Sequence, residues 1–143
     1  MQGVVLKSND LVRVLIADDN FGIREAVKNA IGERFEIVGE AADGLELVAL
    51  ERVLEPSIGI IDISMPKQNG IQAVEAIKSR GSEMKIVFLT VHEDPDFVKA
   101  AFDCGAVGYV VKRQMASDLP KALDVAIAGG IFTSCSGDSK DRN

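Results

Sequence analysis

Short apolar runs rich in Val and Ile alternate along this 143-residue chain with segments whose apolar residues recur at helical spacing. We predict a β-strand for each of these runs, which span residues 12–17, 36–41, 58–61, 85–89 and 107–111. Between and after them, apolar residues three and four positions apart predict five helices, the fourth over 95–102. The first, third and fourth runs are almost wholly apolar, which favours strands buried on both faces of a parallel sheet. The sequence therefore predicts a doubly wound α/β fold, a five-stranded parallel sheet flanked by five helices.

Polar side chains follow four of the predicted strands at the point where each strand ends. They are Asp18 and Asp19 after the first run, Asp62 after the third, Thr90 after the fourth and Lys112 after the fifth. In open parallel sheets, ligands gather outside the carboxyl ends of the strands, where the strand order reverses. Three carboxylates brought together there repel one another unless a cation lies between them, and hard oxygen ligands suit Mg²⁺. No His or Cys lies beside these three carboxylates, which argues against zinc.

This set of side chains is suited to phosphoryl transfer. A carboxylate beside Mg²⁺ can attack phosphorus and become an aspartyl phosphate. The metal and Lys112 would offset the charge on the transferred group, and the Thr90 hydroxyl would donate a hydrogen bond to it. The sequence therefore predicts a phosphorylatable switch rather than a substrate pocket.

Four segments carry a family resemblance: VLIADDN, IIDISMPKQNG, VFLTVHED and GYVVK. In this order and spacing they resemble the receiver domain of response regulators in two-component signalling, over about residues 11–131. The details around DISMPKQNG and LTVHED look most like the NarL/FixJ branch. The resemblance implies the flavodoxin-like, CheY-like fold with strand order 2-1-3-4-5.

The resemblance assigns a role to each residue of the acidic cluster. Asp62 is the implied phosphoacceptor. Asp19 is the implied direct ligand of Mg²⁺, and Asp18 assists through water. The backbone carbonyl of Ser64, two residues past the acceptor, supplies the implied third protein ligand.

The remaining site residues are assigned to phosphoryl contact and to switching. Thr90 and Lys112 are expected to contact the phosphoryl group. Tyr109 matches the switch aromatic, which turns inward when Thr90 moves toward the phosphoryl group. The implied phosphodonor is a sensor histidine kinase or a phosphotransfer protein. The output is expected at the face formed by the fourth helix, fifth strand and fifth helix, which is also the expected homodimer face. Such a domain catalyses only its own phosphorylation and dephosphorylation and is not expected to be an enzyme with a separate substrate.

Composition limits the binding partners and the cellular location that we expect for this chain. The formal net charge of −6 disfavours nucleic-acid binding by this chain. No apolar run approaches the roughly 18 residues of a membrane helix, and the first ten residues do not resemble a signal peptide, so we expect a cytoplasmic chain with no membrane contact. Two cysteines without C-x-x-C spacing are interpreted as reduced thiols. We expect a leader over 1–10, the receiver over 11–131 and a polar, disordered tail over 132–143.

Two other functions stay open at this stage. The chain could be the receiver fragment of a DNA-binding transcriptional regulator whose helix-turn-helix domain is absent from it. It could also be a Mg²⁺-dependent phosphohydrolase with an Asp nucleophile. Such enzymes commonly carry a second Asp two residues beyond the nucleophile, where this chain has Ser64, and usually need a cap for which this chain has no spare length.

Three more positions near the site are singled out by the sequence. Arg113 follows Lys112 where the family often has Pro after a cis peptide bond, so this peptide is either trans or strained. His92 is the only histidine, and a lone histidine in a loop is expected to be solvated. Ser64 and His92 also hold the two positions that tune dephosphorylation in the family.

Val91 generates a first prediction, because the position after Thr90 is usually Ala or Gly in the family. Its larger side chain is expected to narrow the path of phosphodonors to Asp62. Phosphorylation by a small donor such as acetyl phosphate should therefore be slow, and Val91→Ala should accelerate it. Time courses of phosphoprotein formation test this, and equal rates for the two proteins would contradict it.

Overall fold

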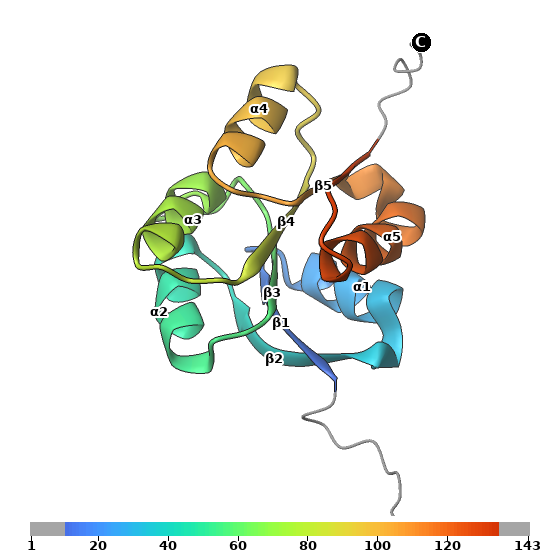
Figure 1. Ribbon diagram of the computed structural model, residues 1–143, viewed down its shortest axis with the longest axis horizontal. Helices are drawn as coiled ribbons and strands as arrows, with labels where there is room; N and C mark the ends of the chain where they lie inside the picture. The colour runs from blue at the N-terminus through green and yellow to red at the C-terminus, as the bar shows by residue number, and fades with distance from the viewer. Residues whose placement is uncertain (1–10, 135–143) are drawn as a thin grey trace, which may run out of the picture.

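The computed structural model describes residues 11–134, which form one parallel sheet with helices on both faces (Figure 1). The strands are β1 (Val12–Ala17), β2 (Phe35–Ala41), β3 (Ile58–Ile61), β4 (Lys85–Thr90), β5 (Gly108–Val111) and β6 (Phe132–Thr133). Their order across the sheet is β2-β1-β3-β4-β5-β6, and every neighbouring pair is parallel. The predicted order of the first five strands is confirmed.

The sixth strand corrects the prediction of a five-stranded sheet. The backbone turns at Gly129, whose φ is +90°, and Phe132 then pairs with Gly108 at the edge of β5. Phe132 and Thr133 had been assigned to a disordered tail, because a two-residue strand is too short to show any periodicity. The predicted leader over 1–10 and the rest of the predicted tail, with Cys135, lie outside the described residues.

Five helices follow strands, as predicted, and divide between the two faces of the sheet. They are α1 (Phe21–Ile31), α2 (Gly44–Leu54), α3 (Gly70–Ser79), α4 (Pro95–Asp103) and α5 (Met115–Ile127). Figure 1 shows α1 and α5 over one face, α2 and α3 over the other, and α4 beside β5. None of the helices within residues 11–134 has the length and apolarity needed to cross a membrane.

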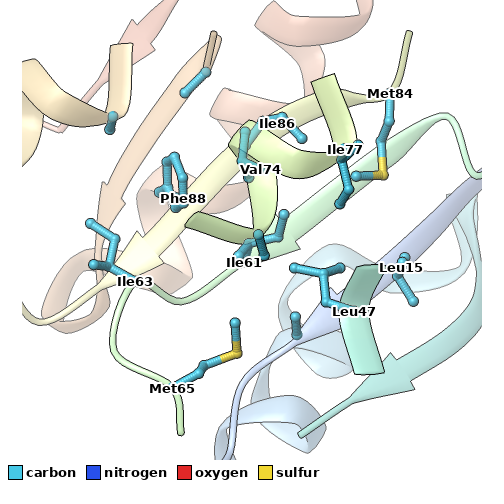
Figure 2. Close-up of a cluster of buried hydrophobic side chains, with 14 of the residues drawn as sticks. Leu15, Leu47, Ile61, Ile63, Met65, Val74, Ile77, Met84, Ile86 and Phe88 are labelled. Atoms are coloured by element: carbon cyan, nitrogen blue, oxygen red, sulfur yellow. The ribbon is translucent and has the colours of Figure 1, made fainter. Parts of the chain in front are cut away.

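The strands are buried on both faces, and this explains their nearly continuous apolar sequences. Along β1, Val14 and Ile16 join the cluster beneath α1 and α5. The alternate residues Leu15 and Ala17 join the cluster beneath α2 and α3, which Figure 2 shows with Leu47 facing the sheet. Alternating side chains of a strand point to opposite faces, so β1 to β5 each contribute to both cores, whereas β6 adds only Phe132 to the cluster beneath α1 and α5.

Capping residues begin four of the helices close to the ends of the preceding strands. The Asn20 side chain accepts a hydrogen bond from the Ile23 amide at the start of α1. Asp43 and Asp94 cap α2 and α4 in the same way, and Asn69 forms a reciprocal capping box with Gln72 on α3. Such caps satisfy backbone amides that have no partner within the helix. The helix starts thereby fix the loops at the carboxyl edge of the sheet.

The loop between β3 and α3 closes tightly on its own backbone at Gly70. The Gly70 amide donates a hydrogen bond to the Ile63 carbonyl at 2.7 Å. A Cβ atom at Gly70 would lie 2.1 Å from the carbonyl oxygen of Asp62, which is much closer than any real contact. Gly70 therefore lets α3 begin directly against the backbone of Asp62.

Gly70→Ala is expected to be strongly destabilising because the new methyl group would meet backbone that cannot rotate away. We expect a loss of unfolding free energy at or above the roughly 1–3 kcal/mol of overpacked sites. Gly81→Ala is the matched control, since Gly81 has φ +87° with nothing near its Cβ position and should lose only roughly 1–2 kcal/mol through backbone strain. Urea denaturation of both variants measures the difference, and an equal or smaller loss for Gly70→Ala would contradict the close approach.

Candidate metal and phosphoryl site

Three carboxylates meet at the carboxyl edge of the sheet, where β1 and β3 end. The side chains of Asp18, Asp19 and Asp62 each place an oxygen within 4.8 Å of the others. Asp18 and Asp62 are buried, whereas Asp19 is exposed. Within residues 11–134, these carboxylates are the cluster of side chains placed to hold a metal ion, and the cluster contains neither histidine nor cysteine.

Lys112 reaches into the same cluster from the end of β5. Its Nζ atom lies 2.8 Å from Asp18 Oδ2 and 3.1 Å from Asp62 Oδ2. Burial by itself would lower the pKa of Lys112, but the two carboxylates outweigh burial and raise it. Burial raises the pKa of the Asp62 carboxyl, and Lys112 opposes that shift. The cluster thus holds three acidic groups against one ammonium.

The donor set fits a hard divalent cation. Asp18 Oδ1 accepts a hydrogen bond from the Asn20 amide at 2.9 Å, and the buried Asp18 Oδ2 faces the Lys112 ammonium at 2.8 Å. The single Lys112 ammonium does not balance three clustered carboxylates, and buried negative charge is costly unless cations offset it. Carboxylate oxygens and water are the ligands that Mg²⁺ prefers, so Asp18, Asp19 and Asp62 could hold this ion.

Thr90 and Tyr109 meet at the backbone of His92. Thr90, fully buried at the end of β4, accepts a hydrogen bond on Oγ1 from the His92 amide at 3.3 Å. The Tyr109 hydroxyl donates to the His92 carbonyl at 2.8 Å, and the Tyr109 side chain is only 1% exposed. The predicted switch aromatic therefore lies inward in this structure, joined to the residue two positions beyond Thr90.

His92, predicted to be solvated, is only partly exposed to solvent and has two side-chain partners. Its Nε2 atom lies 2.7 Å from Ser64 Oγ in a hydrogen bond. Its ring stacks on Phe97 of α4, with centroids 4.2 Å apart and planes 19° apart. Ser64 is 28 residues from His92 along the chain, so this partner could not be read from the histidine's own surroundings in the sequence.

Three further positions bear on the rim of the site. Every peptide bond in the described residues is trans, including that between Lys112 and Arg113. The Arg113 guanidinium donates two hydrogen bonds to Glu93, at 2.7 and 2.8 Å. The Val91 side chain is largely exposed, and its effect on donor access stays a prediction. The role of the Ser64 carbonyl as a ligand also stays a prediction.

Sequence reasoning missed Arg24, which contacts the backbone of Asp18. Arg24 on α1 donates a hydrogen bond to the backbone carbonyl of Asp18 at 2.7 Å. In the sequence, Arg24 is one of several charged residues on an amphipathic helix, which is the pattern of an ordinary solvated face.

Comparison with known proteins agrees with this geometry. The family model of the "Response regulator receiver domain" matches residues 14–124. The chain is 33% identical over 123 residues to the transcriptional regulatory protein DegU of Brevibacillus brevis, covering 85% of this chain and 52% of that protein. It is 41% identical over 117 residues to the transcriptional regulatory protein PdtaR of Mycobacterium tuberculosis (strain CDC 1551 / Oshkosh), covering 81% and 57%.

A solved structure extends the comparison to three dimensions. The signal receiver domain of the putative response regulator NarL from Mycobacterium tuberculosis superposes with a TM-score of 0.79 at 29% sequence identity, covering 83% of this chain and 98% of that chain. The similarity to NarL and DegU supports the NarL/FixJ branch. The chain spans between half and three fifths of the length of the two curated relatives.

The inward position of Tyr109 generates a prediction on pH. Burial raises the pKa of Tyr109 to about 12, with smaller contributions from nearby carboxylates. Because the folded pKa lies above the ordinary value of about 10, burial of the neutral phenol favours the folded state fully below pH 10. That contribution is lost as the pH rises through the folded pKa.

Ultraviolet absorbance can follow this titration directly, because the chain has one Tyr and no Trp. The phenol should remain protonated in the native chain at pH values where it is half ionised in the urea-unfolded chain. Circular dichroism shows whether the chain is still folded at each pH. A native midpoint near that of the unfolded chain would mean that Tyr109 is exposed in solution.

Proposed function

Because this chain belongs to the response regulator receiver domain family, we propose that its function is carried by phosphorylation of Asp62. One observation supports this assignment above the others. The buried Asp62 carboxylate shares a cluster with Asp18 and Asp19 and lies 3.1 Å from the Lys112 ammonium. The residues that would hold Mg²⁺ are Asp19 directly, Asp18 through water, Asp62 and the Ser64 carbonyl.

The chain's own residues supply the phosphoryl-transfer chemistry. An Asp62 oxygen attacks phosphorus, a new O–P bond forms, and the bond from phosphorus to the donor breaks. Mg²⁺ would offset the negative charge on the transferred group and on the carboxylates. Lys112 adds a second positive charge beside Asp62, and the Thr90 hydroxyl donates to a phosphoryl oxygen. The donor we propose is a phosphohistidine on a sensor histidine kinase or phosphotransfer protein.

Signal output follows as a shift between two conformations. Phosphorylation changes their populations only to the extent that the phosphoryl group interacts better with Thr90 and Lys112 in one of them. Thr90 is linked to Tyr109 through the backbone of His92, which offers a route to the face made by α4, β5 and α5. Figure 1 shows α4 at the periphery of the molecule, and Ala101 is the residue of α4 that is buried. We propose this face for output, including homodimer formation.

The names of the relatives suggest which cellular process the switch controls. DegU and PdtaR are named transcriptional regulatory proteins, and we extend regulation of transcription to this chain, in the cytoplasm. The acidic chain itself is not expected to bind DNA, so a DNA-binding output domain or a partner protein would carry the signal.

Intact mass after incubation with Mg²⁺ and acetyl phosphate tests the proposal. The wild-type chain should gain one phosphoryl group, and Asp62→Asn should gain none. Asp94→Asn is the matched control, because it removes a carboxylate that caps α4 outside the cluster and should leave phosphorylation intact. Chelation of Mg²⁺ should abolish the gain in the wild type.

Two results would contradict this function. Phosphorylation of Asp62→Asn to the wild-type level would exclude Asp62 as the acceptor. Steady release of phosphate far beyond one equivalent from a small phosphoester would favour the phosphohydrolase instead.

A further inference from the structure

Arg24 contacts Asp18 at the backbone carbonyl of Asp18 rather than at a carboxylate. The guanidinium Nη1 donates to the carbonyl oxygen of Asp18 at 2.7 Å. Asp18 is also held by its amide, which donates to the Ala41 carbonyl at 3.0 Å. The peptide that leads from Asp18 into Asp19 is therefore restrained at the Asp18 carbonyl by a side chain from α1. The direction in which the Asp19 carboxylate leaves the strand depends on this peptide.

Arg24 is itself held in place by a network of charged residues. Its Nε atom donates to Glu40 on β2 at 2.8 Å, and Lys28 pairs with both Glu40 and Glu25. The Arg24 and Glu40 side chains are 16% and 27% exposed, so this pair is largely withdrawn from solvent. Hydrogen bonding from Lys28 and then from Arg24 lowers the pKa of Glu40 despite its partial burial. The guanidinium also lies over the Phe21 ring, 5.6 Å from its centroid.

The charges of this network cancel. Two positive groups, Arg24 and Lys28, face two negative groups, Glu25 and Glu40. Loss of the Arg24 charge would leave the network negative, and by Coulomb's law this would strengthen the binding of a nearby cation. Loss of the hydrogen bond to Asp18 would instead loosen the Asp18–Asp19 backbone and weaken the binding of the cation. The two roles of Arg24 thus predict effects of opposite sign.

We propose that Arg24 is a positioning residue for the divalent cation: it fixes the Asp18–Asp19 backbone so that both carboxylates face Asp62. This inference rests on the proposed function, since it assigns a role toward the same metal site. Arg fits the role because its planar fork can donate to Asp18 and Glu40 at once, in directions that a lysine ammonium cannot reproduce. Residues that orient metal ligands from behind typically change metal affinity by about 10–100-fold when removed.

Calorimetric titration of the full chain with Mg²⁺ tests the proposal. Arg24→Gln should weaken Mg²⁺ binding by about tenfold, the lower end of that range, although it removes a positive charge near the site. Lys28→Gln is the matched control, because it removes the same charge from the same network and leaves the Arg24 contact with Asp18 in place. Its affinity should be unchanged or slightly higher. Arg24→Lys, which keeps the charge but not the fork, should fall between Arg24→Gln and the wild type.

A second measurement separates positioning from a general loss of structure. Amide exchange in the absence of Mg²⁺ should accelerate at residues 18–20 in Arg24→Gln and remain at wild-type rates in β4 and β5. If Arg24→Gln does not fold, Arg24→Lys decides the question by the same two measurements.

The outcomes of the titration are distinct. Wild-type or tighter Mg²⁺ binding by the folded Arg24 variant would overturn this proposal and leave the function of Asp62 untouched. A wild-type chain that binds no Mg²⁺ would instead contradict the proposed metal site itself.

Discussion

Repulsion among Asp18, Asp19 and Asp62 is the constraint on which the rest of this structure depends. Three carboxylates within 4.8 Å of one another repel in a partly buried position. Residues from separate elements of the fold keep them together. Lys112 brings a positive charge from β5. Gly70 allows α3 to begin against the Asp62 backbone. These supports suit the cation and the phosphoryl group of the proposed function.

His92 connects this site to the periphery of the molecule. Its amide and carbonyl bond to Thr90 and Tyr109, and its side chain bonds to Ser64 and stacks on Phe97. The loop before α4 is therefore tied to the loop that follows Asp62, to the end of β4 and to β5. A rearrangement at Thr90 has a continuous set of contacts through which it can reach α4.

The part of the fold that the sequence predicts is the part set by local pattern. Strand runs, helix periodicity and the positions of polar residues at strand ends are all visible along the chain, and the sheet edge then brings the carboxylates together. The contacts of His92 and Arg24 were missed because they depend on which side chains meet across separate elements. Ser64 and His92 are 28 residues apart, and nothing in the neighbourhood of either one indicates the other. The two-residue β6 was missed for another reason, since it is stabilised by pairing with β5 rather than by its own composition.

The size of these contacts suits a switch. A typical intramolecular hydrogen bond contributes roughly 0.5–1.5 kcal/mol net, and the links from His92 to Ser64, Thr90 and Tyr109 are single bonds of this kind. In the proposed switch, two conformations that differed by a few such bonds would be separated by a free energy that one phosphoryl group could reverse, because its charge-assisted hydrogen bonds are about twice as strong as neutral ones. Ala101 is the fully buried residue of α4, and Phe97, Val98 and Phe102 pack half-buried against the core beneath α2 and α3. Movement of α4 in the proposed switch would therefore have to disturb these apolar contacts as well as the hydrogen bonds of His92.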